Sequence, residues 1–385
     1  MAPSELAIVL SGGGARAAYQ AGLLAGIAER FPELEVPILT GVSAGAINAV
    51  YLAAHTGTFG SAVAGLTRHW AGLTPDQVFR VDAASLGKSV LRWGVRLVSG
   101  GLPGSPQVRG LVDTTPLRGF LGRVLNANAG PIPGIVENLE SGRLKAVALI
   151  TTSYSTGQTV VWVQGRGIEL WERPQRRSHQ AALTIDHAMA SAALPLFFPA
   201  VRIGDEWYGD GGIRLAAPLS PALHLGASRI LAISTRYIKG EAEAGRPVIT
   251  HYPPPAQVAG VLMNAIFLDL IDQDAHRLER LNRLLERLPE GEREGMRVVD
   301  LMVLRPSRDL GRLAREYEPR LPKGFRFMTR GLGTREAASP DALSIIMFQP
   351  DYLERLIELG LEDARARGDE IAAFLAGERL AHAGA

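Results

Sequence analysis

The sequence of 385 residues contains no cysteine. This absence excludes disulfide frameworks, thiol nucleophiles, cysteine-ligated zinc and iron–sulfur clusters, and it is compatible with a reducing compartment. Aromatic residues make up only 6% of the chain, and the formal net charge is only +2. Neither an aromatic platform for RNA nor a strongly basic face is indicated. We therefore expect no nucleic-acid partner.

Long apolar runs are also absent. No stretch reaches the roughly 18 uninterrupted apolar residues of a membrane-spanning helix, and the N-terminus lacks the basic segment of a signal peptide. The sequence therefore predicts a soluble, cytoplasmic protein. Disorder is excluded for the bulk of the chain, because 46% of its residues are hydrophobic.

Strand and helix patterns alternate from the start of the chain. Residues 5–10 form an unbroken apolar run, a glycine-rich turn follows, and residues 15–30 carry apolar side chains at helical spacing. The pattern repeats with a strand at 36–40, a turn at 41–45 and a helix from 46 onward. Two strand–turn–helix units in succession predict a parallel α/β fold. Further strands are expected at 144–152, 159–163, 200–203, 229–234 and 298–304. Helices are expected at 185–193 and 351–375, and one or two long helices over 258–288.

The remaining organisation is predicted from composition. We expect an α/β core over residues 5–235, with a glycine-rich cap insertion at 86–112. Residues 236–385 are expected to form a mostly helical C-terminal region packed on the core. The predicted apolar stripe of its long helical segment consists of Leu278, Leu281, Leu285 and Leu288.

Three segments could carry chemistry, and the first is Gly41-Val42-Ser43-Ala44-Gly45. A serine on a sharp strand-to-helix turn projects its hydroxyl from the edge of the sheet, and the flanking glycines avoid clashes with the neighbouring strand and helix. Here the required strand precedes and the required helix follows. The alternative is a glycine-rich turn with an idle serine.

The second segment is Ser11-Gly12-Gly13-Gly14-Ala15-Arg16, again between a strand and a helix. Successive glycine N–H groups and the following helix N-terminus suit an anion, either a phosphate or the oxyanion of an acyl-transfer intermediate. The dinucleotide alternative needs an acidic residue at the end of the second strand. That position leads instead into Thr40-Gly41-Val42-Ser43.

The third segment is Trp207-Tyr208-Gly209-Asp210-Gly211-Gly212, which on its own indicates a simple turn. A serine nucleophile needs a base, however, and none of the histidines lies in a motif of a triad base. The simplest alternative is a carboxylate that accepts the serine proton directly. The histidines are His55, His69, His179, His187, His224, His251, His276 and His382.

Taken in order, these three segments resemble the patatin-like phospholipase family. The resemblance covers roughly residues 5–235 and includes the segment Ala190–Pro195 ahead of the aspartate; Ala17 stands where the family commonly has glycine. It implies a three-layer α/β/α fold with a mostly parallel central sheet, and lipid acyl hydrolysis by a Ser–Asp dyad. The implied roles are nucleophile and base for Ser43 and Asp210, oxyanion hole for Gly12, Gly13 and Gly14, basic loop residue for Arg16, and support of the elbow and dyad for Gly41, Gly45, Gly211 and Gly212.

The substrate is the least defined part of the prediction. We expect cleavage of phospholipid or lysophospholipid acyl esters, with no cofactor, no metal and independence of calcium. The alternatives are an esterase or thioesterase with the same dyad and a non-catalytic lipid-binding module. The segment Ser89–Val98, with two arginines among apolar residues, is interpreted either as an interfacial cap that touches a membrane or as a surface helix packed on the domain.

Overall fold

The computed structural model describes residues 5–80, 109–238, 252–267, 270–321 and 341–378, together with positions 91, 95, 96, 98, 99, 240, 243 and 326. Most of the predicted cap insertion, 86–112, and most of the segment Ser89–Val98 lie outside these residues.

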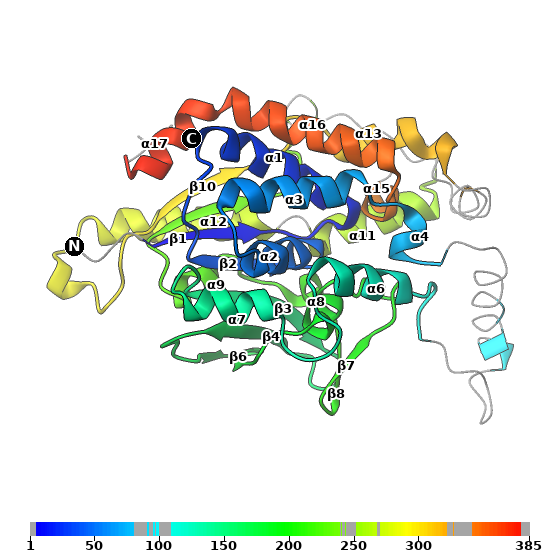
Figure 1. Ribbon diagram of the computed structural model, residues 1–385, viewed down its shortest axis with the longest axis horizontal. Helices are drawn as coiled ribbons and strands as arrows, with labels where there is room; N and C mark the ends of the chain where they lie inside the picture. The colour runs from blue at the N-terminus through cyan, green and yellow to red at the C-terminus, as the bar shows by residue number, and fades with distance from the viewer. Residues whose placement is uncertain are drawn as a thin grey trace.

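One mixed sheet forms the centre of the molecule (Figure 1), with the strand order β10-β9-β1-β2-β3-β4-β6-β5. The five strands from β10 to β3 run parallel. Strand β4 is antiparallel to β3, and a hairpin of β7 and β8 joins the sheet through an antiparallel pairing of β8 with β3. The strands are β1 (Leu6–Leu10), β2 (Ile38–Val42), β3 (Ala146–Ser153), β4 (Thr159–Gly165), β5 (Glu172–Arg173), β6 (Arg176–Gln180), β7 (Val201–Ile203), β8 (Glu206–Asp210), β9 (Arg229–Ile233) and β10 (Asp300–Leu304).

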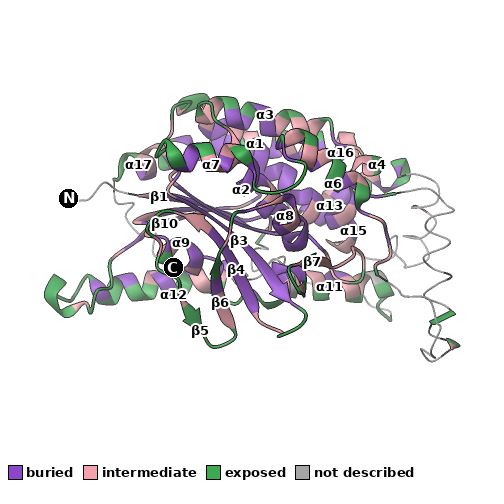
Figure 2. Cartoon of the chain, turned by 60° about the horizontal axis from the view of Figure 1, so that its bottom comes forward, coloured by how far each residue is buried: buried purple, intermediate pink, exposed green. Residues whose placement is uncertain are grey.

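Helices cover both faces of this sheet, which gives three layers (Figures 1 and 2). In β1, Ile8 points into the larger core and Val9 into the smaller one, as the two-residue period of a strand requires. Because both faces are buried, the central strands are continuous apolar runs. The larger core is covered by α1 (Ala17–Arg30), α2 (Ala44–Ala54), α3 (Phe59–Ala71) and α16 (Pro350–Ala366), and the smaller core by α9 (Ser220–His224) and α12 (Leu270–Leu285).

Shorter helices complete the layers and surround the ends of the strands. They are α4 (Pro75–Val78), α6 (Thr115–Val124), α7 (Pro133–Glu140), α8 (Ile185–Ser191), α11 (Pro255–Phe267), α13 (Leu310–Tyr317), α15 (Asp341–Ile346) and α17 (Gly368–Ala376), with 3-10 turns η1 (Gly14–Arg16), η2 (Gly211–Arg214), η3 (Glu290–Glu292) and η4 (Glu318–Arg320).

The C-terminal region packs closely on the first helix. A side chain at Gly22 of α1 would lie 1.9 Å from the Ile357 carbonyl oxygen, and one at Gly360 of α16 would lie 2.2 Å from that of Tyr19. Glycine therefore allows these two helix backbones to touch. Strand β10 of the same region pairs with β9 in the central sheet. The division of the chain into a core and a C-terminal region near residue 235 stays a prediction.

The predicted fold class is confirmed, and most predicted elements are present, but two details were wrong. The one or two helices expected over 258–288 are two, α11 and α12, whereas the single helix expected over 351–375 is divided at Arg367–Gly368. The stripe of α12 is misplaced: Leu278 and Leu285 are buried, whereas Leu281 and Leu288 are 38% and 39% exposed. The buried face consists instead of Ile271, Ala275, Leu278, Asn282 and Leu285.

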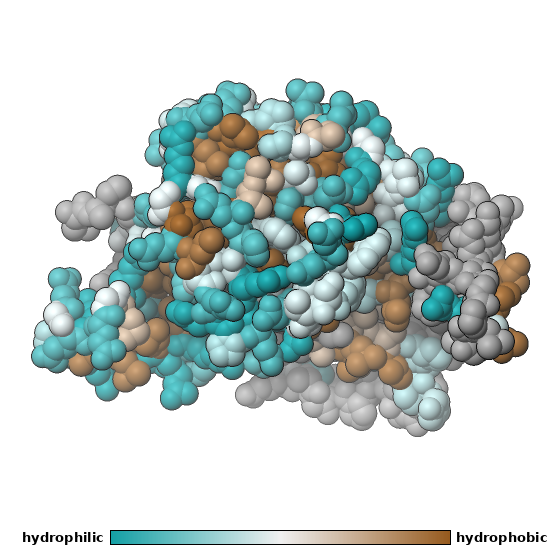
Figure 3. Space-filling view, turned by 90° about the horizontal axis from the view of Figure 1, so that it is seen from below, coloured by the Kyte–Doolittle hydropathy of each residue, from teal (hydrophilic) through white to brown (hydrophobic). Residues whose placement is uncertain are grey.

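The surface shows no continuous apolar band on the face seen in Figure 3, where hydrophobic side chains are scattered among hydrophilic ones. Within the described ranges, every helix is too short or too polar to traverse a bilayer.

Candidate active site

The register of the sheet brings the predicted nucleophile and base together. Strand β2 pairs with β3 up to Val42, which lies opposite Ile150. Strand β8 then continues along the same edge of β3, with Asp210 opposite Thr151, because β4 occupies the other edge. Asp210 therefore lies end-to-end with the last residue of β2, beside Ser43.

Ser43 occupies a strained turn between β2 and α2. Its backbone angles are φ 56° and ψ −133°, a conformation that non-glycine residues rarely adopt. A Cβ at Gly41 would lie 2.4 Å from the carbonyl oxygen of Gly45, and one at Gly45 would lie 2.3 Å from that of Ser11. A side chain at either glycine would clash with the neighbouring backbone, so both positions require glycine. The turn places Ser43 at the carboxyl ends of β1 and β2.

The carboxyl group of Asp210 is buried, and only one of its two oxygens has a hydrogen-bond partner in the described ranges. Oδ1 accepts the N–H of Gly212 at 2.8 Å. Oδ2 has no partner of hydrogen-bond geometry among the described residues. Burial raises the pKa of Asp210 to about 7, while the Ser43 hydroxyl and the Gly212 N–H lower it. A base with a pKa near neutral pH, next to a serine, suits proton transfer.

The aspartate also depends on a glycine. A Cβ at Gly211 would lie 2.2 Å from the carbonyl oxygen of Ile150 and 2.9 Å from Val42 Cγ2. Only glycine allows the chain after Asp210 to pass this close to the end of β2.

The glycine-rich loop after β1 lies directly over Ser43. A side chain at Gly12 would approach Ser43 Cβ to 3.0 Å. Gly13 and Gly14 have φ values of 148° and 56°. Within the described part of the chain, the N–H groups of these three glycines donate to no acceptor. They are thus available to a developing negative charge next to the serine.

A buried hydrogen-bond network holds this loop in place. The Thr235 hydroxyl donates to the Gly12 carbonyl at 2.6 Å. The Gln20 amide donates to the Ser11 carbonyl at 2.9 Å and accepts from Asn48, whose own carbonyl accepts from the Trp70 indole N–H. Each of these buried polar side chains therefore has a partner, as a rigid site requires.

Ser191 of α8 supports the nucleophile turn, a role that sequence reasoning did not assign. Its hydroxyl accepts the backbone N–H of Ser43 at 3.0 Å and donates to the Ile150 carbonyl at 2.6 Å. The sequence did contain a signal, since this serine lies in the apolar segment Ala190–Pro195 and is fully buried.

Arg16 binds to residues of the C-terminal region. It is 3% exposed, forms an ion pair with Asp341 at 2.5 Å and donates to the Ser344 hydroxyl at 2.7 Å. Asp341 also accepts from Asn264 of α11. The predicted basic loop residue therefore fastens α15 to the glycine loop, and nothing in the sequence indicated its partners.

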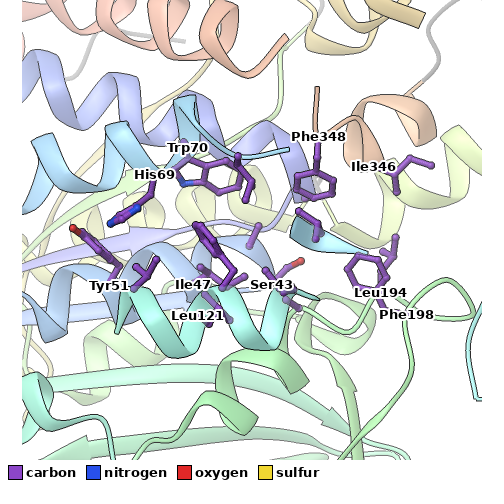
Figure 4. A pocket seen from close by; sticks show the side chains of 18 of the residues that line it. Ser43, Ile47, Tyr51, His69, Trp70, Leu121, Leu194, Phe198, Ile346 and Phe348 are labelled. Atoms are coloured by element: carbon purple, nitrogen blue, oxygen red, sulfur yellow. The ribbon is translucent and has the colours of Figure 1, made fainter. Parts of the chain in front are cut away.

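An apolar pocket opens next to Ser43 (Figure 4). It measures about 820 Å³ including its open mouth. Helices α2, α3 and α6 form its walls, and α15 with the chain around Leu194 surrounds Ser43. Apart from Ser43, the polar groups that reach it are few, chiefly Tyr51 and His69, which Figure 4 places at the end away from the serine. Such a site accommodates an acyl chain beside a nucleophile.

Comparison with known families agrees with this geometry. Residues 8–223, more than half of the chain, match the patatin-like phospholipase family. The chain belongs to this family. Membership supports lipid acyl hydrolysis as the general activity of this patatin-like protein. No curated protein matches its sequence.

Solved structures that are similar to this chain have low sequence identity to it. They include human GIVD cytosolic phospholipase A2 (11% identity, TM-score 0.49), VipD from Legionella pneumophila (13%, 0.39) and the type III effector ExoU of Pseudomonas aeruginosa (15%, 0.38). They align with 97%, 98% and 98% of this patatin-like chain, respectively. The chain spans 60%, 67% and 54% of their own lengths.

Metal-binding side chains are not clustered in the part of the molecule that the structure describes. No group of three or more His, Asp or Glu residues there is arranged to hold an ion.

Proposed function

We propose that this protein is a serine acyl hydrolase that cleaves fatty-acyl esters of phospholipids or lysophospholipids. Ser43 is the nucleophile and Asp210 is the general base. One observation carries the proposal: β2 and β8 pair with the same edge of β3, so that Asp210 lies next to Ser43, which lines an apolar pocket.

In the first step, Asp210 accepts the hydroxyl proton while Ser43 Oγ bonds to the ester carbonyl carbon. The carbonyl oxygen becomes an oxyanion, which the N–H groups of Gly12, Gly13 and Gly14 stabilise. Collapse of this intermediate expels the alcohol, which takes the proton from Asp210, and leaves an acyl-serine beside an ionised Asp210. Water, deprotonated by Asp210, then attacks the acyl-serine; the fatty acid is released as Asp210 returns the proton to Ser43 Oγ.

The raised pKa of Asp210 accounts for its capacity as a base. A carboxylate with an ordinary pKa is a weak base for an alcohol, and burial strengthens it. The unpaired Oδ2 is the atom we assign to the proton transfer, since Oδ1 is held by Gly212. Catalytic hydrogen bonds of this kind commonly shorten once substrate is bound.

Peripheral contact with a lipid surface is part of the proposal. Helix α11 exposes Val258, Val261 and Leu262 on one face, at 47%, 59% and 55%. This helix packs on α15, whose Ile345 and Ile346 line the pocket. Exposed apolar side chains next to the pocket suit insertion into a lipid interface.

Active-site labelling tests the dyad. A fluorophosphonate probe, read by intact mass, should give one adduct on the wild type, none on Ser43→Ala and a much slower one on Asp210→Asn. The substrate class is tested by turnover of phosphatidylcholine, lysophosphatidylcholine and a neutral acyl ester in the same mixed micelles. Labelling together with turnover of the neutral ester alone would exclude the phospholipid assignment but retain the dyad. Absence of labelling, with and without lipid vesicles, would exclude the mechanism.

A further inference from the structure

The apolar pocket has a direction set by helix α2. Ser43 caps this helix, and Ala44, Ile47 and Tyr51 follow on the face that lines the pocket. Figure 4 shows the same order, from Ser43 past Ile47 to Tyr51. Tyr51 follows the nucleophile by eight positions in the sequence, which corresponds to about 12 Å at the helical rise.

At the end of the pocket away from Ser43, rings from three helices pack against one another. Tyr51 of α2 meets His69 of α3 edge-on at 5.4 Å between ring centroids. His69 in turn meets Phe120 of α6 edge-on at 6.0 Å. These three rings, the ring stop, all line the pocket.

The ring stop is fixed in position. A Cβ at Gly65 would lie 2.1 Å from the Tyr51 hydroxyl, so the phenol is seated directly on the backbone of α3. Burial, and after it the nearby Arg68, lowers the pKa of His69, which favours its neutral imidazole. The pocket therefore ends in uncharged, tightly placed rings.

We propose that the ring stop of Tyr51, His69 and Phe120 limits the acyl group that this enzyme cleaves efficiently to roughly eight to ten carbons, the extended length that fits within about 12 Å. This inference rests on the proposed function, because it requires the acyl carbonyl to lie at Ser43. It narrows the substrate to medium-chain acyl esters. Longer chains leave their terminal carbons outside the pocket or must displace the rings.

Chain-length profiles test the ring stop directly. We would measure kcat/KM for p-nitrophenyl esters from four to sixteen carbons, presented in the same mixed micelles. Each methylene buried in the pocket should raise kcat/KM roughly fourfold, and the rise should stop near eight to ten carbons. In Tyr51→Ala and His69→Ala, the optimum should move toward longer chains by roughly four carbons, the length of one helical turn.

A matched control variant removes a ring that contacts Tyr51 outside the pocket. His55 also contacts the Tyr51 ring, at 6.2 Å, but does not line the pocket. His55→Ala should therefore keep the wild-type optimum. Ile47→Phe provides a variant of opposite sign, because it fills the pocket midway and should move the optimum to shorter chains.

The outcomes separate this inference from the proposed function. A profile that rises steadily to sixteen carbons, or an optimum unmoved in both Tyr51→Ala and Ile47→Phe, would overturn the ring stop while leaving the dyad intact. If Tyr51→Ala does not fold, His69→Ala and Ile47→Phe decide the question alone. Lack of turnover at every chain length, together with absence of Ser43 labelling, would refute the hydrolase itself.

Discussion

Exchange of Asp210 for asparagine should make the protein more stable at neutral pH while it loses activity. The Asp210 side chain is fully buried, and burial raises its pKa from 3.8 to about 7. Each tenfold change in proton affinity corresponds to about 1.4 kcal/mol, so ionising this carboxyl in the folded protein costs about 4 kcal/mol.

The sign follows from the direction of the change. Because the folded-state pKa lies above the unfolded value, the folded state holds the proton more tightly between these two values. The cost is therefore absent below about pH 4, grows as the pH rises, and is fully present above about pH 7. The asparagine side chain of the variant carries no charge, and its carbonyl oxygen can still accept the Gly212 N–H. The stability of Asp210→Asn relative to wild type should therefore rise by about 4 kcal/mol from below pH 4 to pH 8.

Urea denaturation, followed by tryptophan fluorescence at several pH values from 4 to 8, measures this difference. Subtracting wild type from variant removes the contribution of every other group that titrates in both proteins. Asp205→Asn serves as the control, since Asp205 is fully exposed between β7 and β8; it should change stability by less than about 0.5 kcal/mol at every pH. A difference between Asp210→Asn and wild type that is constant with pH, or that falls as the pH rises, would refute the reasoning.

Four further predictions concern the site. As the pH is lowered, kcat/KM should fall with an apparent pKa near 7, as expected for the base Asp210. An apparent pKa near 4 would contradict the assignment of Asp210 as the base. Ser191→Ala leaves the Ser43 N–H buried without an acceptor, at a cost of about 1–3 kcal/mol, and should lower kcat roughly tenfold in steady-state assays. Gly13→Ala puts a Cβ 2.4 Å from the Thr235 hydroxyl and should reduce kcat about 100- to 1000-fold. Gly142→Ala, also at positive φ but with nothing within 4 Å, should leave kcat unchanged. Chelator treatment should not alter turnover, and a loss that calcium restores would contradict this.

The fold could be predicted wherever burial on both faces makes a strand uniformly apolar. Strands β1, β3 and β9 are such runs and were found within one or two residues. Strand β6 was missed because its sequence, Arg176–Gln180, is polar and only partly buried at the side of the sheet. The break in the predicted C-terminal helix was missed because the apolar spacing continues across Gly368 into α17.

In the site, too, some features follow from neighbouring residues and could be predicted, whereas others depend on residues that are distant in the sequence. The turn of Ser43 follows from neighbouring glycines, and such local geometry is visible in a pentapeptide. The approach of Asp210 depends on how β8 pairs with β3, which the motif implies only through the family resemblance. The ion pair of Arg16 joins residues 325 positions apart. No local pattern indicates such a pair, because both partners would be unremarkable charges in sequence.

The distant contacts also explain how the glycine loop keeps its shape. Glycine can adopt the positive φ values of Gly13 and Gly14, but it can also adopt many others, so contacts must select this conformation. On one side, the Thr235 hydroxyl holds the Gly12 carbonyl at the end of β9. On the other, Gly14 lies so close to the Ile345 carbonyl oxygen of α15 that a Cβ would approach it to 2.1 Å. Since Arg16 fastens α15 in that position, the C-terminal region helps to shape the glycine loop that we propose as the oxyanion site. The proposed hydrolysis therefore depends on residues that lie far beyond the three motifs.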